Sequence, residues 1–268
     1  MTLLAAALLG IVQGITEFLP VSSTAHLLLI GNAIGYQDPG GVFTVMIQLG
    51  SILAVVWVYR LKILAVVSSL RTRAESRRFA AAIILATIPA LLAGALLADF
   101  VKRILYESPE VFAWAFIIGG VVMLVLDRRM TTPAVHRAED TPPSRALAVG
   151  MCQMVALVPG VSRSGATIVG GISAGLSRTA AAEFSFFLAI PTMTAAFLHD
   201  LLQVSDQLSP SRSLEIGVGL AMAFISSLIV IKPFLSFVAR AGFARFAWYR
   251  IALGLALLVA MGAGWVRG

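Results

Sequence analysis

Six stretches of the chain carry no Asp, Glu, Lys or Arg and are apolar over most of their length. Each is long enough, or nearly so, to cross the hydrocarbon core of a bilayer as a tilted α-helix. They cover residues 39–59, 79–98, 111–126, 184–199, 216–231 and 251–266. The pattern predicts an all-α polytopic membrane protein with about six transmembrane helices.

Two further apolar regions are interrupted near their middle. Residues 1–35 are broken by Glu17, Pro20 and the hydroxyl run that follows them, and residues 146–176 are broken by Pro159 and a Ser-Arg-Ser run. Proline ends a helix and Ser or Thr can cap the next one. Each region therefore predicts two half-length helices around a polar turn, which is the pattern of a re-entrant hairpin.

Composition supports the membrane assignment. Hydrophobic residues make up 59% of the 268 residues and charged residues only 12%, against about 25% charged in soluble domains. This excludes a disordered chain and a water-soluble domain. A net charge of +7 suggests a nucleic-acid partner in a soluble protein, but here the bilayer is the expected partner and the charge sets orientation.

Basic residues concentrate in three connections. Residues 60–78, 127–145 and 232–250 hold fourteen of the 20 Lys and Arg residues, Arg250 included. Basic loops stay on the cytoplasmic side, so these three connections are predicted to be cytoplasmic. Counting crossings from there makes 146–176 enter and leave on the cytoplasmic face. Residues 1–35 form either a hairpin from the outside or a pair of full crossings, and the half-helix pattern favours the hairpin.

The two broken regions also resemble each other. Three identities are offset by 140 residues: Gly10 and Gly150, Gln13 and Gln153, and Ser22 and Ser162. Each region is followed by three spans, and the odd number of crossings places the copies in opposite orientations. We expect one membrane domain over 1–268 with an inverted repeat, comprising 1–126 (hairpin 1–35) and 146–268 (hairpin 146–176), as in many transporters.

The first break carries candidate catalytic groups. Gln13 and Glu17 are four residues apart and share a helical face, and Ser23 and His26 are three apart. Ser22, Ser23 or Thr24 can cap the second half-helix. Charged side chains at membrane depth are costly and by default functional, which favours a functional Glu17.

The second break predicts an anion site. Its Arg163, the backbone N–H groups from Gly160 onward and the hydroxyls of Ser162, Ser164 and Thr167 suit a phosphate. Glu17 opposes a simple anion unless it binds a cation or exchanges a proton. A diphosphate with Mg²⁺ or Ca²⁺, held by Glu17 and Gln13, satisfies all these groups. The plainer alternative is that Glu17 and Arg163 only pair with each other.

At both breaks the chain resembles the undecaprenyl-diphosphate phosphatase family, also called bacitracin-resistance proteins. The similarity is carried by the Gln13-to-Glu17 spacing and by residues 18–27 and 159–167, and it continues at 48–50, 88–90 and 181–191. Many members have Glu where this chain has Gln13.

The resemblance implies an enzyme of the bacterial cytoplasmic membrane that removes the terminal phosphate of undecaprenyl diphosphate. The monophosphate carrier is then reused for peptidoglycan synthesis. The family's site faces the periplasm and needs a divalent cation. A homodimer is left open.

Together these readings assign Glu17, Ser23, His26 and Arg163 to catalysis, and Ser22, Thr24, Gly160, Ser162, Arg163, Ser164 and Thr167 to the diphosphate. His26 is the candidate general acid or base. The nucleophile is Ser23, another hydroxyl or water. A second lipid phosphatase motif fails because Val169 stands where it needs histidine. A polyprenyl-phosphate flippase or anion transporter is the remaining alternative.

Overall fold

The computed structural model describes residues 2–36, 38, 41–101, 108–129, 132–204 and 212–264. Lys102 and Arg103, which do not belong to the three basic connections, lie outside these ranges. The chain folds into helices α1 (Leu3–Thr16), α2 (Ser23–Ala33), α3 (Val42–Val58), α4 (Arg60–Ser68), α5 (Ala74–Phe100), α6 (Pro109–Arg129), α7 (Pro143–Met154), α8 (Arg163–Ser173), α9 (Arg178–Val204), α10 (Ser213–Ala241) and α11 (Ala244–Gly262), with short 3₁₀ turns η3 (Ala138–Asp140) and η4 (Val155–Leu157).

The predicted spans are confirmed as helices. Within the described residues, five helices are long and apolar enough to cross a membrane: α5, α6, α9, α10 and α11. The sixth candidate is α3 together with α4, two helices bent by 67° at Tyr59. The fold is therefore an all-α polytopic membrane protein.

Two connections expected to be loops are largely helical. α4 occupies the first half of 60–78, and α10 and α11 fill 232–250 except for a turn at Gly242 and Phe243. The amphipathic end of a long helix tolerates Lys and Arg. Span boundaries placed at the first charged residue therefore make the helix too short.

Arg250 is the clearest correction to the loop assignment. The sequence places it among the orienting charges of a cytoplasmic connection, but it lies within α11 and is only 1% exposed. Its charge is tolerated there because four backbone carbonyls accept hydrogen bonds from its guanidinium.

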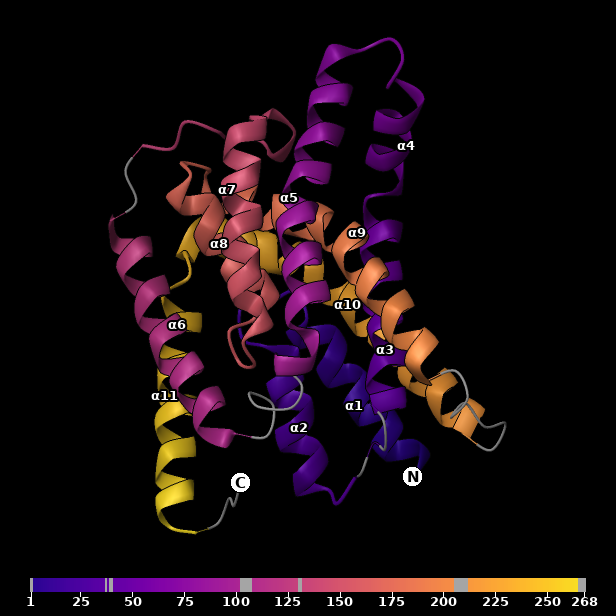
Figure 1. Cartoon of the computed structure of the whole chain (residues 1–268), viewed down its shortest axis with the longest axis vertical. Coiled ribbons are helices and arrows are strands. Elements are labelled where there is room, and N and C mark those ends of the chain that lie inside the picture. Colours follow the sequence, from indigo (N-terminus) through magenta and orange to yellow (C-terminus); the bar gives the residue numbers. More distant parts are fainter. Residues whose placement is uncertain are drawn as a thin grey trace.

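The two broken regions form helical hairpins. In Figure 1, the α7–α8 hairpin descends from the end that carries α4, whereas α1 and α2 lie toward the opposite end. We call α1–α2 the first hairpin and α7–α8 the second hairpin; their breaks are residues 17–22 and 158–162. The polar breaks of the two hairpins are in contact, because Ser164 donates a hydrogen bond to the Leu19 carbonyl at 2.9 Å.

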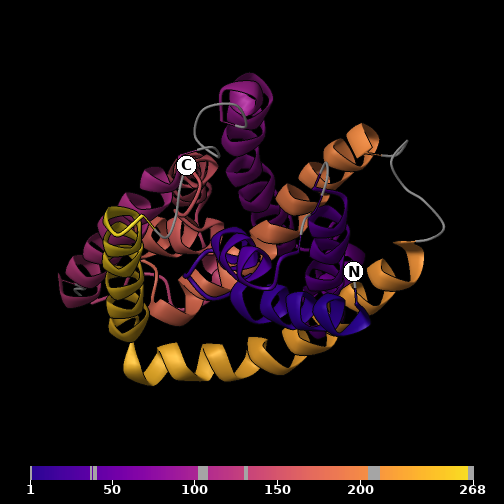
Figure 2. The ribbon, with the colours of Figure 1, turned by 90° about the horizontal axis from the view of Figure 1, so that it is seen from below.

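Each hairpin packs closely on one long helix. α1 lies along α10, as Figure 2 shows from below, and α7 packs against α5. A Cβ at Gly10 would collide with the Gly219 carbonyl, and a Cβ at Gly150 would collide with the Ala86 carbonyl. Glycine at these two positions lets the helix backbones touch, which is how small residues work in membrane bundles.

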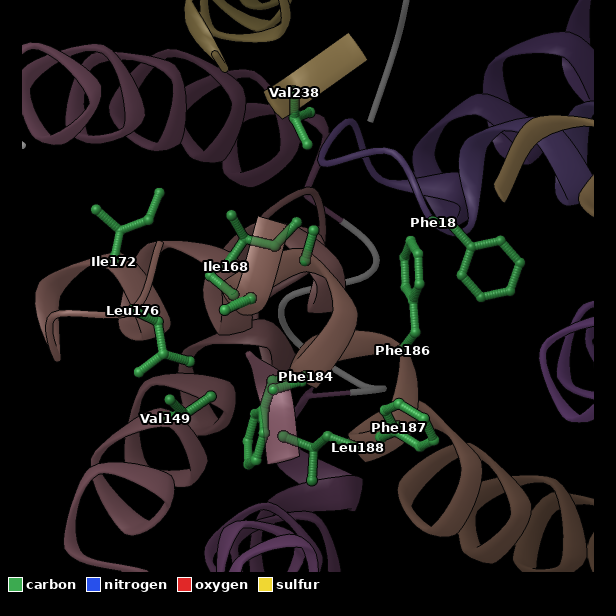
Figure 3. Close-up of a cluster of buried hydrophobic side chains, with 14 of the residues drawn as sticks. Phe18, Val149, Ile168, Ile172, Leu176, Phe184, Phe186, Phe187, Leu188 and Val238 are labelled. Atoms are coloured by element: carbon green, nitrogen blue, oxygen red, sulfur yellow. The ribbon is translucent and has the colours of Figure 1, made fainter. Parts of the chain in front are cut away.

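An aromatic-rich core supports both breaks. Phe18, at the first break, packs edge-to-face on Phe186 of α9 with ring centroids 5.2 Å apart. Val149 and Ile168 of the second hairpin belong to the same buried cluster (Figure 3). The hairpin tips are therefore fixed against α9, which also carries part of the site.

Candidate active site

A cavity of about 1210 Å³ lies over the two breaks. Both hairpins contribute polar side chains to its wall. The predicted site residues in this wall are Glu17, Ser22, Ser23 and Thr24 from the first hairpin and Ser162 and Arg163 from the second, together with the backbone of Gly160. The structure thus brings together, in one wall, seven of the predicted site residues from segments about 140 residues apart.

Glu17 is the centre of the polar network. Its Oε1 accepts a hydrogen bond from Arg163 Nη2 at 3.0 Å, which closes a salt bridge between the hairpins. Its Oε2 accepts from Ser23 Oγ at 2.7 Å and from Gln13 Nε2 at 3.0 Å. The carboxylate is 7% exposed. Glu17 therefore contacts both Ser23, the predicted nucleophile, and Arg163, the predicted anion-binding residue.

Arg163 is held by α9 as well as by Glu17. Its Nη1 donates to the Ser185 carbonyl at 3.1 Å and lies 3.3 Å from the Ser185 hydroxyl. Thr167 Oγ1 is 2.6 Å from Ser185 Oγ and donates to the Arg163 backbone carbonyl at 2.9 Å, so Thr167 contacts Arg163 and its partner Ser185 from behind the cavity wall. The Nε of Arg163 is buried without a hydrogen-bond partner. The guanidinium is thus oriented but keeps donor capacity for a ligand.

The backbone at the two breaks adopts the same unusual conformation. Ser22 has φ 68° and Ser162 has φ 75°, and they are the two non-glycine residues with positive φ in the described chain. Each residue is the N-cap of the following half-helix. The Ser162 hydroxyl accepts from the Gly165 N–H at 3.1 Å. The first N–H groups of α2 and α8 have no partner inside their own helices, and so provide donors for an anion.

His26 faces away from the cavity. Its Nδ1 lies 2.8 Å from the Ser22 carbonyl and its Nε2 lies 2.6 Å from the Tyr249 hydroxyl. The two rings are stacked, with centroids 5.7 Å apart. The ring therefore links the first break to α11, although the sequence spacing suggested that it shares a ligand with Ser23.

Three other predicted residues also lie behind the cavity wall. Gln13 orients Glu17, Ser164 bonds to Leu19, and Thr167 bonds to Ser185. Glu17 and Arg163 do pair with each other, which the sequence allowed as the plainer alternative to a functional role. The same pair lines the cavity, so the salt bridge and a role in binding are compatible.

Sequence reasoning missed Ser185, Tyr249 and Arg250. Ser185 lies inside the 181–191 segment that carries the family resemblance, and that segment was the available signal. Tyr249 and Arg250 lie at the edge of an apolar run, where they read as interfacial. Their contacts with the hairpins need the folded chain.

The residues at the site fit a divalent cation only in part. The described residues contain no group of three or more His, Cys, Asp and Glu side chains placed to hold a metal. Glu17 supplies one carboxylate, and Gln13 Oε1 is a buried oxygen without a partner. Mg²⁺ is commonly held by one or two carboxylates plus substrate phosphates. The donor set fits a cation that enters with a diphosphate.

The fold and this site define a class: an integral membrane protein whose two broken helical hairpins meet at a cavity with a polar wall. Residues 6–256 match the model of the family described as "Bacitracin resistance protein BacA". The chain belongs to that family.

Curated relatives are similar over nearly their whole length. "Undecaprenyl-diphosphatase 1" of Agrobacterium fabrum is 48% identical over 260 residues, covering 97% of each chain. "Undecaprenyl-diphosphatase" of Paracoccus denitrificans is 45% identical over 260 residues, again covering 97% of each. "Undecaprenyl-diphosphatase" of Cereibacter sphaeroides is 46% identical over 264 residues, covering 98% of each.

Proposed function

We propose that this protein hydrolyses undecaprenyl diphosphate to undecaprenyl phosphate and inorganic phosphate. The reaction returns the lipid carrier to peptidoglycan synthesis and confers bacitracin resistance. Membership of the BacA family and the names of the relatives support this activity. The observation that carries it is the contact of Glu17 with both Ser23 and Arg163 at the wall of one cavity.

The second hairpin binds the diphosphate in this proposal. Arg163 and the first N–H groups of α8 contact the phosphoryl oxygens, with the hydroxyl of Ser162 beside them. Donors held in place before the reaction stabilise the charge that develops in phosphoryl transfer. Ser185 keeps the guanidinium in position from α9, so little reorganisation is needed when the substrate enters.

The first hairpin activates the nucleophile. Ser23 Oγ forms a bond to the terminal phosphorus while its proton passes to Glu17 Oε2, 2.7 Å away. The bond from that phosphorus to the bridging oxygen breaks, and undecaprenyl phosphate leaves with the electron pair. Water then attacks the phosphorus of the phosphoserine and the bond from that phosphorus to Ser23 Oγ breaks. Glu17 returns its proton to Ser23 Oγ, and inorganic phosphate leaves with the oxygen and both hydrogens of the water.

A divalent cation completes the site in this proposal. Glu17, which lines the cavity, would hold it together with the substrate phosphates, and Gln13 behind the wall keeps the Glu17 carboxylate oriented. When bound, the cation neutralises charge on the phosphoryl oxygens. Because the protein offers few ligands, the cation and the diphosphate are expected to bind together.

The cavity's position supports a periplasmic active site in the bacterial cytoplasmic membrane. Its walls include the first residues of α3 and the last residues of α5 and α9, which are the ends remote from the basic connection between α4 and α5. The basic connection is cytoplasmic by the positive-inside rule. Apolar lining residues, among them Leu28, Leu91 and Leu157, suit a prenyl chain.

An inverted repeat accounts for this geometry, and we include it in the proposal. The helix order α1, α2, α3, α5, α6 recurs as α7, α8, α9, α10, α11, and the N-cap residues Ser22 and Ser162 keep the offset of 140. The paired glycines Gly10 and Gly150, each against a long helix, also support it.

Phosphate release tests the function directly. Purified protein in detergent is given a polyprenyl diphosphate, with Mg²⁺ or Ca²⁺ and with a chelator, and inorganic phosphate is measured. We expect turnover that depends on the cation and is lost in Glu17→Gln. A flippase or anion transporter gives no phosphate under these conditions, and folded wild-type protein without turnover would overturn the proposal.

A further inference from the structure

Arg250 makes an unusual set of contacts deep in the molecule. Its Nη1 donates to the carbonyls of Pro20 at 3.0 Å and Val161 at 2.8 Å. Its Nη2 donates to the carbonyls of Gly160 at 3.1 Å and Ala115 at 2.9 Å. One side chain from α11 therefore bonds to the breaks of both hairpins and to α6.

The charge of Arg250 is not cancelled by an acid. No carboxylate pairs with it in the part of the chain that the structure describes. Removing a cation from water is costly unless its donors find partners. Here Nη1 and Nη2 donate to four carbonyls and the ring of Phe116 lies 5.4 Å from Cζ, while Nε is buried without a hydrogen-bond partner. A net positive charge therefore stays behind the site that we assign to the diphosphate.

Neighbouring helices leave room for this guanidinium. A Cβ at Gly119 of α6 would collide with Nη2, and a Cβ at Gly165 of α8 would lie 3.2 Å from Nη1. Glycine at these positions lets the planar group lie flat between α6 and α8. The surroundings thus fit an arginine at position 250, and not merely any cation.

The bonds also fix the direction of the peptide groups at the breaks. Because a trans peptide is planar, a carbonyl that points to Arg250 sends the following N–H to the opposite side. At Val161 this following N–H belongs to Ser162, whose φ is 75°. Positive φ at a non-glycine residue is strained and persists only where the surroundings hold it. Arg250 turns electron-rich carbonyls toward α11 and away from the anion.

We propose that Arg250 is a positioning residue for phosphoryl transfer. It holds both breaks in the conformation that presents the N–H groups of α2 and α8 to the diphosphate, and it adds a positive potential from behind. This inference rests on the proposed phosphatase function. It concerns a residue that lies behind the cavity wall, acting through Pro20, Gly160 and Val161.

The test separates positioning from folding. Arg250→Lys keeps the charge but loses the planar fork, so it cannot reach all four carbonyls. We expect kcat to fall by about 10- to 100-fold, as for a small misplacement of a catalytic constellation, while KM changes less than about threefold and the folded fraction is retained. Arg178→Lys, at the Arg178–Asp127 pair of α9 and α6, is the matched control and keeps wild-type kcat.

A second variant leaves Arg250 in place. Gly119→Ala displaces its Nη2, whereas Gly217→Ala meets nothing within 4 Å and serves as the matched glycine control. We expect Gly119→Ala to lower kcat and Gly217→Ala to leave it unchanged. The inference is wrong if folded Arg250→Lys and Gly119→Ala both keep wild-type kcat, or if their loss of activity only follows the unfolded fraction. Absence of turnover in wild-type protein would instead remove the proposed function.

Discussion

The two hairpin breaks share a backbone but not a chemistry. Both have a proline, a serine N-cap at positive φ and the start of a new half-helix. The first break carries the carboxylate of Glu17 and the hydroxyl of Ser23, whereas the second carries the guanidinium of Arg163. Both breaks bring the N-terminus of a half-helix to one cavity, and the side chains divide the proposed work into activation and binding. The similar backbone accounts for the two helix N-termini, and the different side chains account for the different roles proposed for the two hairpins.

The largest effect is expected from removing the binding half. Arg163→Met deletes the guanidinium that lies over the cavity, and we expect turnover to fall by about 10³-fold or more, the order seen when an arginine is lost from phosphoryl transfer. Steady-state phosphate release measures it. Because the variant leaves Glu17 buried without its ion pair, Glu17→Gln/Arg163→Met is the folding control. Near wild-type turnover of folded Arg163→Met would contradict the division of roles.

Removing the activating half comes next. Glu17→Gln keeps the size of the side chain but cannot accept the proton of Ser23, and we expect kcat to fall by about 10²- to 10⁴-fold. With a chelator present, so that loss of the cation ligand plays no part, binding of a non-hydrolysable diphosphate analogue should be kept or strengthened, because Arg163 loses its competing partner. Calorimetric titration of the analogue checks this. Equal loss of binding in Glu17→Gln and Arg163→Met would show that the two halves are not separable.

The nucleophile is tested at Ser23. In Ser23→Ala we expect kcat to fall by about 10²-fold or more, since the Ser23 hydroxyl that bonds to Glu17 is gone. Rapid quenching of wild-type protein with substrate labelled in the terminal phosphate should trap a phosphoserine. Thr24→Val, which removes the neighbouring hydroxyl that also lines the cavity, is the matched control with a small effect. If Ser23→Ala keeps turnover, Ser23 is not the nucleophile and the attacking group is another hydroxyl or water.

Sequence patterns predicted the spans and the two breaks because both follow from local rules. Uncharged runs give helices, and Pro next to Ser or Thr gives a stop and a cap. The residues that line the cavity were found for the same reason, since charge at membrane depth stands out at Glu17 and Arg163. That these residues lie in the wall of one cavity could not be predicted from such local rules.

The sequence did not predict which distant parts of the chain His26 and Arg250 contact. His26 is three positions from Ser23, but the tilt of α2 turns its ring to Tyr249, 223 residues away. Arg250 was assigned to a loop because the predicted span was started after the last charged residue, although the helix begins before it. Both residues depend on α11, whose contacts with the breaks are entirely long-range.

The smallest effect is expected at His26, and it separates support from catalysis. Its ring bonds to the Ser22 carbonyl and to Tyr249, outside the cavity lining. His26→Gln should therefore cost about one hydrogen bond, on the order of 1 kcal/mol, and lower kcat by about fivefold. Tyr249→Phe removes the same bond to His26 Nε2, so its effect should be similar and the double variant no worse than either. A general acid or base would instead give a loss of about 10²-fold or more, with one limb of the kcat–pH profile removed. If His26→Gln shows that loss while Tyr249→Phe does not, the histidine turns into the cavity when substrate binds, and the first hairpin has a second proton-transfer group that the second hairpin lacks.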